Sequence, residues 1–218
     1  REINMSGLLI LGAGGHGKVV LEIAKLSKQW DDIAFLDDRT DLKEILGTPI
    51  IGKFEDYLSF RENYKYAFVA LGNNHLRIKW INLLSKFGFI IPTLIHPFTY
   101  ISPTSVLKEG TVVMAGSVIN ASTKIGKGCI INTSSSIDHD CKIQDGVHIS
   151  PGVHIAGSVS VNKYSWVGIG ATIINNITIG SNVVVGAGSV VNKNIPDNVM
   201  VAGVPAVIKK QLGVINYE

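Results

Sequence analysis

The chain has 218 residues, and its 20 Lys and Arg against 17 Asp and Glu give a formal net charge of +3. This length suits one large domain or two small ones, and so small a charge excludes the electrostatic footprint of a nucleic-acid-binding protein. The apolar runs are shorter than the roughly 18 residues of a membrane span, so we expect no membrane insertion. The opening REINMSG lacks the architecture of a signal peptide, and we therefore expect a cytoplasmic protein.

The first 94 residues are predicted to alternate between strands and helices. They hold 23 of the 37 charged residues and 11 of the 16 aromatic residues, as an ordinary globular domain would. Alternation of this kind predicts a small parallel sheet covered by helices. Strands are predicted over 8–12, 32–38 and 66–73, and helices over 18–28, 53–62 and 75–88, the last with Gly88 as its C-cap.

A glycine-rich turn separates the first predicted strand from the first predicted helix. Gly12, Gly14 and Gly17 match the pattern G-x-G-x-x-G. The first glycine permits a tight turn, the second lets the backbone approach a phosphate, and the third packs helix on strand. Asp37 ends the next strand, where a carboxylate is suited to ribose hydroxyls. The pattern predicts a site for a nucleotide diphosphate at the helix N-terminus, with a merely structural turn as the alternative.

The size of this region bears on which nucleotide it holds. About 85 residues provide barely one of the two mononucleotide-binding halves that a dinucleotide needs. A nucleotide-diphosphate sugar therefore fits better than NAD. His16 lies inside the turn, beside the expected phosphates. We expect it to contact the sugar or its phosphate, with a surface histidine as the alternative.

From residue 95 onward the chain is a six-residue repeat. Seventeen consecutive positions at this spacing, from Ile95 to Val191, are Ile, Leu or Val. A slim residue follows most of them at the fourth step, and Cys129 and Cys141 are interpreted as such packing residues. Glycine often stands at the third step, where a bend needs unusual backbone angles. The fixed period predicts a parallel β-helix whose aliphatic side chains fill the interior.

The segment 131–161 contains three of the six histidines. His139 and Asp140 follow an aliphatic repeat position at a bend, so both are expected to point outward. A carboxylate beside an imidazole can raise the basicity that a general base needs near pH 7. His148 and His154 each precede an aliphatic repeat position on successive sides of the coil. A histidine on a solenoid surface requires no function, so spacing alone leaves these roles open.

Five segments, GAGGHGKVV, FLDD, ALGNN, NTSSSIDHDC and AGVPA, resemble sugar O- and N-acetyltransferases over Leu8 to about Lys210. This family, which includes bacillosamine, perosamine and sialic-acid acetyltransferases, joins a small nucleotide-binding domain to a left-handed β-helix. The resemblance implies an α/β Rossmann-like domain over 1–94, a left-handed parallel β-helix over 95–208 and a C-terminal tail over 209–218. It also implies 18-residue triangular coils, homotrimers with active sites between subunits, and acetyl-CoA as co-substrate, with no bound cofactor or metal.

The resemblance further implies roles for individual residues. His139 matches the general base and Asp140 its acidic neighbour, although bacillosamine enzymes carry Glu there, which is one methylene longer. Lys209 and Lys210 match either contacts to coenzyme phosphates or a solvated tail. Substrate contacts are implied at Gly14, Gly15, His16, Asp37, Asp38, Gly72 and Asn132, and acetyl-CoA contacts at His148, Ile169, Ala187 (where relatives often carry Gly) and Pro205.

The reaction expected from this resemblance is direct acetyl transfer to the 4-amino group of a nucleotide-linked sugar such as UDP-4-amino-4,6-dideoxy-GlcNAc. His139 would accept the amine proton, and a backbone N–H that the sequence does not identify would stabilise the oxyanion. GDP-perosamine N-acetylation and sialic acid O-acetylation are alternatives within the family. Three alternatives lie outside the family. A γ-type carbonic anhydrase would need a histidine spacing that this sequence lacks, and an NAD-dependent oxidoreductase would leave the repeat unexplained. The third is a non-catalytic sugar-nucleotide-binding protein.

Overall fold

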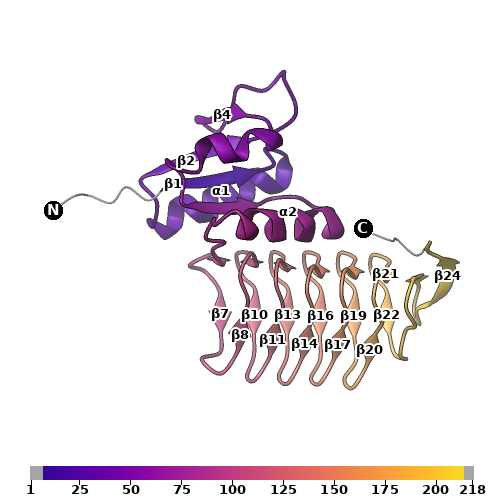
Figure 1. Ribbon diagram of the computed structural model, residues 1–218. Helices are drawn as coiled ribbons and strands as arrows, with labels where there is room; N and C mark the ends of the chain where they lie inside the picture. The colour runs from indigo at the N-terminus through magenta and orange to yellow at the C-terminus, as the bar shows by residue number, and fades with distance from the viewer. Residues whose placement is uncertain (1–6, 214–218) are drawn as a thin grey trace. The chain divides into compact units, whose positions relative to one another are not determined.

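The computed structural model describes residues 7–213, and the chain divides between Pro97 and Phe98 into two compact units (Figure 1). The first unit is an α/β fold and the second is a parallel β-helix. The predicted order of a small α/β domain followed by a hexapeptide-repeat coil is therefore confirmed. In the described part of the chain, no helix combines the length and the apolar character that crossing a membrane requires.

A five-stranded sheet in the order β3-β4-β2-β1-β5 forms the centre of the first unit. All five residues of β1 are buried, as expected for a parallel strand covered on both faces. Strands β1, β2, β4 and β5 run parallel, so their carboxyl ends meet at one edge. The five strands are β1 Gly7–Leu11, β2 Asp32–Leu36, β3 Glu44–Ile45, β4 Thr48–Gly52 and β5 Tyr66–Val69. A further short strand, β6 Leu94–Ile95, lies outside this sheet.

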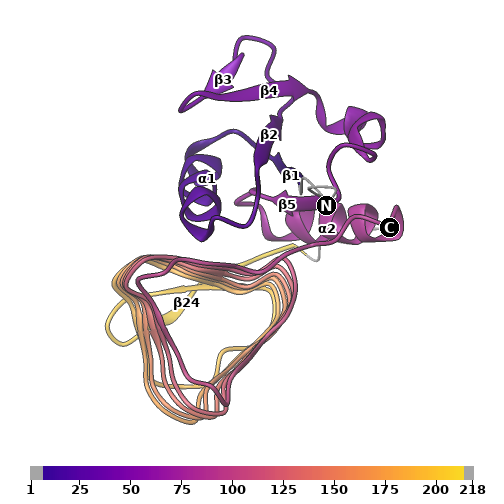
Figure 2. The same ribbon diagram turned by 90° about the vertical axis from the view of Figure 1, so that its left-hand side faces the viewer.

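Two α-helices and a short 3₁₀ helix accompany this sheet, with α1 on one side of β1 and β2 and η1 on the other (Figure 2). Helix α2 ends at Lys86 with Phe87 as its C-cap, and Gly88, predicted as the C-cap, follows with φ +85°. The Gly88 N–H donates to Ser85 O and the Phe89 N–H to Leu84 O, which is the Schellman pattern. The helix predicted over 53–62 is only a 3₁₀ helix. The bounds are α1 Gly15–Ser27, η1 Phe54–Phe60 and α2 Asn74–Lys86.

The hairpin of β3 and β4 was not predicted. Its two-residue loop, Leu46 and Gly47, has positive φ at both positions, as a type I′ turn requires. The usual sequence signal for that turn is Asn-Gly or Asp-Gly, and leucine replaces the first residue here. A two-residue strand such as β3 also provides no readable alternation.

In the second unit, three two-residue strands make each 18-residue coil, and the coil is triangular in cross-section (Figure 2). Strands one coil apart pair in parallel and in register, so repeat aliphatics stack on one another; Ile119 pairs with Ile137, for example. The first sheet contains β7 Tyr100–Ile101, β10 Val118–Ile119, β13 Ser136–Ile137, β16 His154–Ile155, β19 Thr172–Ile173 and β22 Val190–Val191.

The other two faces of the triangle follow the same rule. The second sheet contains β8 Val106–Leu107, β11 Lys124–Ile125, β14 Lys142–Ile143, β17 Ser160–Val161 and β20 Thr178–Ile179. The third contains β9 Val112–Val113, β12 Ile130–Ile131, β15 His148–Ile149, β18 Trp166–Val167, β21 Val184–Val185, β23 Val199–Ala202 and β24 Val207–Gln211. Strand β24 pairs antiparallel with β23. Lys209 and Lys210 therefore lie in a strand, and a tail does not begin at 209.

Slim residues at the coil corners bury polar atoms without leaving them unpaired. The hydroxyl of Thr111 donates to Gly126 O at 2.8 Å and accepts from the Cys129 N–H at 3.0 Å. Cys129 and Cys141 occupy equivalent buried corners as free thiols, with Sγ 3.1 Å from Gln144 O and 3.2 Å from Ala156 O respectively. Each corner thus connects successive coils through one small side chain.

The bends use the left-handed conformation at the predicted third step. The seven glycines there have φ between 60° and 71°. Other turns place Ser, Asn, Tyr or Asp in the same conformation, and Asp140, with φ 59°, is one of them. Asp and Asn tolerate this region better than most residues with a side chain. Asp140 is therefore presented by a backbone conformation that the repeat imposes.

Candidate active site

The glycine-rich turn lies between β1 and α1, at the carboxyl edge of the sheet. Gly12 has φ +105°, and an added Cβ would lie 2.8 Å from Ala70 O. A Cβ on Gly17 would collide with the Gly12 carbonyl oxygen. Nothing lies within 4 Å of a Cβ added at Gly14 or Gly15. Two of these glycines are thus required by close packing, whereas the other two leave the start of α1 open to a ligand.

Asp37, directly after β2, holds this turn in place. The residue is 8% exposed, and its carboxylate accepts four hydrogen bonds, from the Ala13 N–H and from the Arg39 N–H, Nε and Nη2. The hydrogen bond from the Arg39 guanidinium lowers the pKa of Asp37 to about 2, against the opposing effect of burial. Asp38 is exposed and accepts from the Phe54 N–H at 3.0 Å. Sequence reasoning assigned Asp37 to ribose and missed Arg39, the partner that occupies both of its oxygens.

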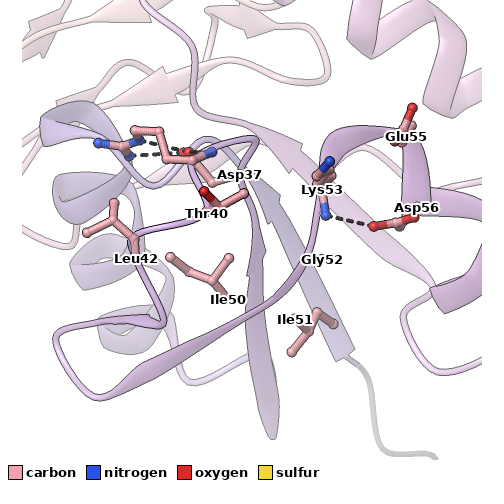
Figure 3. Close-up of a pocket in the computed structure, with 10 residues that line it drawn as sticks. Asp37, Thr40, Leu42, Ile50, Ile51, Gly52, Lys53, Glu55 and Asp56 are labelled. Carbon is pink, nitrogen blue, oxygen red and sulfur yellow. Dashed lines mark hydrogen bonds and ion pairs between the residues drawn. The ribbon is translucent and has the colours of Figure 1, made fainter.

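A pocket of about 490 Å³ adjoins Asp37 (Figure 3). Strand β4, which belongs to the unpredicted hairpin, provides Ile50 and Ile51 as apolar lining. The basic Arg39 and Lys53 line the same pocket together with the acidic Asp37, Glu55 and Asp56. An apolar wall with polar groups around it, beside an open helix N-terminus, suits a nucleoside joined to phosphates.

His16 and Arg77 lie behind the turn. The Nε2 atom of His16 is buried and has no hydrogen-bond partner among the described residues. Burial and the charge of Arg77 lower the pKa of His16 to about 4, so its ring is neutral at pH 7. The buried Arg77 donates from Nη1 to Leu71 O at 2.8 Å and to Gly72 O at 3.3 Å. Arg77, which the sequence did not single out, fixes the loop after β5 that presents the uncrowded Gly72.

In the second unit, His139 and Asp140 form an exposed pair at the corner between β13 and β14. His139 Nδ1 lies 2.8 Å from Asp140 Oδ2, so the shorter aspartate side chain does reach the imidazole. Because a carboxylate only accepts, Nδ1 carries the proton and Nε2 is the basic nitrogen of the neutral ring. The hydrogen bond to Asp140, helped by the charge of Asp138, raises the pKa of His139.

A second polar cluster lies on the third sheet. Asn132 Nδ2 is 3.3 Å from His148 Nε2. The Trp166 ring stacks on His148, with centroids 5.8 Å apart and planes 8° from parallel, and its Nε1 donates to Ser150 Oγ at 2.8 Å. The structure therefore joins Asn132, expected near the acceptor, to His148, expected near the donor. Trp166 was missed, although its position one coil after His148 would have placed the two rings side by side.

The remaining predicted donor contacts are distributed along the third sheet and the turns that follow it. Ile169 and Ala187 occupy equivalent turns one coil apart, and the Gly188 N–H donates to Ile169 O at 2.8 Å. Pro205 lies in the loop between β23 and β24. These turns form the corner between the third and first sheets, whereas His139 lies at the corner between the first and second. One chain therefore does not bring the predicted base and the predicted donor contacts together.

His154 is paired outside both clusters, with Nδ1 2.8 Å from Ser136 Oγ. It lines a shallow pocket of about 250 Å³ together with Asn120 and Asp138. Within residues 7–213, no three His, Cys, Asp or Glu side chains are grouped so as to hold a metal ion.

Two family models match the chain. The PglD N-terminal domain matches residues 7–84, and six repeats of the bacterial transferase hexapeptide match residues 122–157. Among curated proteins, UDP-N-acetylbacillosamine N-acetyltransferase from Bacillus subtilis is 39% identical over 112 residues, which cover 50% of this chain and 51% of the relative. A serine acetyltransferase from Buchnera aphidicola is 41% identical over 58 residues, or 27% and 21% of the two chains. The chain thus spans about a fifth to a half of these curated relatives.

Solved structures match over much more of the chain. The acetyltransferase domain of PglB from Neisseria gonorrhoeae, in complex with acetyl coenzyme A, is 40% identical with a TM-score of 0.90, covering 93% of this chain and 98% of that one. A mutant of perosamine N-acetyltransferase from Caulobacter crescentus, in complex with CoA and GDP-perosamine, is 38% identical with a TM-score of 0.91, covering 97% and 100%. These matches confirm the resemblance, and the chain belongs to the hexapeptide-repeat acetyltransferases with a PglD-type N-terminal domain.

Proposed function

We propose that this protein transfers the acetyl group of acetyl-CoA to the 4-amino group of a nucleotide-diphosphate amino sugar of the UDP-4-amino-4,6-dideoxy-GlcNAc type. The observation that carries the proposal is the exposed His139–Asp140 pair, 2.8 Å apart. It stands in a chain that is 38–40% identical to acetyltransferases solved with acetyl coenzyme A, or with CoA and GDP-perosamine.

His139 is the general base in this proposal. With Nδ1–H donated to Asp140, the Nε2 lone pair accepts a proton from the sugar amine as its nitrogen attacks the thioester carbonyl. The new C–N bond forms, the C–S bond breaks, and the proton on Nε2 passes to the departing thiolate of coenzyme A. The two cysteines are buried, so neither is available as a nucleophile for an acyl-enzyme, and the acetyl group passes directly between the substrates. Much of the rate comes from holding both substrates together.

The first unit is proposed to bind the nucleotide part of the acceptor. The N–H groups at the start of α1, left open at Gly14 and Gly15, suit the diphosphate. The pocket beside Asp37 suits the nucleoside, with Ile50 and Ile51 against the base. A neutral His16 suits a hydrogen bond to the sugar or its phosphate, because its buried Nε2 has no partner among the described residues.

We also propose a homotrimer with active sites between subunits. His139 and the His148 cluster lie on different corners and faces of one triangular coil, so a single chain cannot place both against one thioester. Two β-helices side by side allow His139 of one subunit to face His148 of its neighbour. This arrangement agrees with the family resemblance, and size-exclusion chromatography with light scattering tests it directly.

The experiment that tests the proposed function measures thiol release from acetyl-CoA with four acceptors: UDP-4-amino-4,6-dideoxy-GlcNAc, GDP-perosamine, free sialic acid and CMP-sialic acid. Release with the UDP sugar is expected and would establish both reaction and acceptor. Release with GDP-perosamine alone would favour the second candidate, which the Caulobacter complex supports. Silence with all four would remove the proposed acceptor class, and failure to bind coenzyme A as well would remove the acetyltransferase assignment.

A further inference from the structure

Gly157 stands at a turn position where the backbone does not require glycine. It is the second residue after a repeat aliphatic. Among the turns that follow the repeat aliphatics from Ile101 to Val185, this is the one turn with glycine at that step. The other turns have Pro, Glu, Ala, Lys, Thr, His, Asp, Ile, Asn or Ser there. The glycines with left-handed φ belong to the third step, and Gly157 is not one of them. Its lack of a side chain therefore needs another physical reason.

That reason is the imidazole of His139. Gly157 lies one 18-residue coil after His139, at the same corner of the triangle. A Cβ on Gly157 would be 2.6 Å from both Cε1 and Nε2 of His139, a separation that real Cβ atoms do not adopt. The Ser158 N–H donates to His139 O at 2.9 Å, so a hydrogen bond opposes any separation of the two backbones. An alanine would have to displace the ring.

The other end of the same ring is also held. His139 Nδ1 is 2.8 Å from Asp140 Oδ2, and the Asp140 N–H donates to Ala121 O at 2.9 Å. We propose that Gly157 is a positioning residue for the general base. The His139 imidazole occupies the space that a side chain at position 157 would fill, and in this position Nδ1 contacts Asp140 while Nε2 remains basic. This inference rests on the proposed function, in which His139 is that base.

Replacing Gly157 by Ala is expected to turn the ring and break its contact with Asp140. Misplacing a catalytic group by about 1 Å costs on the order of 100-fold, so kcat should fall about 10- to 100-fold. KM for acetyl-CoA should stay within about twofold. The charges acting on His139 are Asp138 and Asp140, and the adjacent turns 119–123 and 155–159 contain no titratable residue. Losing the Asp140 contact should therefore move the acid limb of kcat/KM to lower pH.

The matched control is Asn175→Ala, which changes the same turn position one coil further along, where the side chain is exposed. It should leave kcat and the pH profile unchanged. Gly157→Ala should keep the melting temperature close to that of the parent protein, because Gly157 does not have the left-handed φ that would strain an alanine. Comparing the two variants distinguishes an effect on the position of His139 from a general requirement of the coil for a particular residue at this turn position.

A second readout does not depend on turnover. Protein labelled with [13Cε1]histidine is titrated by NMR, and the His139 signal is the one that His139→Gln removes. A lower imidazole pKa in Gly157→Ala, together with the lower kcat, supports the proposal. An unchanged His139 pKa, or a kcat within threefold of the parent, overturns it. If the parent protein acetylates no acceptor while the His139 pKa still falls, the proposed function fails but the seating of His139 by Gly157 stands.

Discussion

Asp140 combines two tasks that usually exclude each other. The repeat places it in the left-handed conformation, with φ 59°, where equivalent turns often use glycine, and its carboxylate contacts His139 Nδ1. Glycine would satisfy the backbone and lose the carboxylate. At this turn Asp140 therefore makes a contact to His139 that glycine could not make.

Replacing Asp140 by Asn should reduce kcat/KM by about tenfold or more. Asp140 raises the pKa of His139, and a base acts only when neutral, so activity in the parent protein is lost as pH falls below that raised pKa. Without the carboxylate the pKa drops, and the acid limb should shift to lower pH. Kinetics between pH 5 and 9 measure both effects.

Asp140→Gly serves as the control for this substitution. It should lose activity like Asp140→Asn but melt at the same temperature or higher, because glycine adopts positive φ without strain. Unchanged activity in both variants would remove Asp140 from the mechanism.

Asp37 provides a prediction about stability. Its pKa of about 2 lies below the ordinary 3.8, so the ionised carboxylate stabilises the folded state above about pH 4, and this contribution is lost as pH falls toward 2. Asp37→Asn should reduce the free energy of unfolding by about 1–2 kcal/mol at pH 7. The difference from the parent should shrink on acidification. Urea unfolding at pH 7 and pH 3 measures it, and equal losses at both would refute the explanation, with the exposed Asp38→Asn as control.

In the β-helix, in-register parallel strands bring outward-facing side chains that are one coil apart next to each other. His148 and Trp166 are paired residues of β15 and β18, and this register alone stacks their rings. The hydrogen bond from Trp166 Nε1 to Ser150 Oγ then fixes the indole. The stack with Trp166 and the contact with Asn132 thus both bear on the orientation of His148.

Trp166→Ala should raise KM for acetyl-CoA severalfold with a smaller change in kcat, because a ring stack contributes about 0.5–1.5 kcal/mol beyond its buried area. Trp166→Phe keeps a ring against His148 and should retain most donor affinity, although its link to Ser150 is lost. Isothermal titration with coenzyme A compares the two variants. Equal affinities in Ala and Phe variants would show that the stack does not serve the donor.

The triangular cross-section of the β-helix places the candidate site residues of one chain on different corners. A triangular coil points its three corners and faces in different directions, so residues that are close in sequence, such as Asn132 and His139, project from different corners. In the proposed homotrimer, a second copy of the chain completes the site. Catalysis would then depend on assembly, which makes assembly itself testable through activity.

Co-expressing His139→Ala chains with His148→Ala chains should restore activity that neither variant has alone. If each site takes His139 from one subunit and His148 from the next, random mixing leaves about a quarter of the sites intact. Purified mixed trimers, each chain carrying a different tag, would be assayed for thiol release. Activity no higher than that of the separate variants would place both histidines of a site on one chain.

The sequence by itself determined the architecture. Seventeen aliphatics at a spacing of six from Ile95 to Val191 can be buried together only by a coil of the same period, and G-x-G-x-x-G between a strand and a helix specifies an open turn. These are local or strictly periodic signals, so they can be read without knowing what else packs nearby. His139 and Asp140 were likewise readable, because adjacent residues at a bend are neighbours in any fold.

Only the tertiary structure decided which distant side chains meet. The 18-residue period places Gly157 next to the turn of His139 and Trp166 next to His148, but which of their atoms touch depends on side-chain orientation. The occupation of Asp37 by Arg39 and the pocket beside the β3–β4 hairpin depend on side-chain geometry and on a leucine-containing turn. Periodicity specifies which residues face inward, but the outward contacts of single side chains follow from packing, which no local pattern encodes.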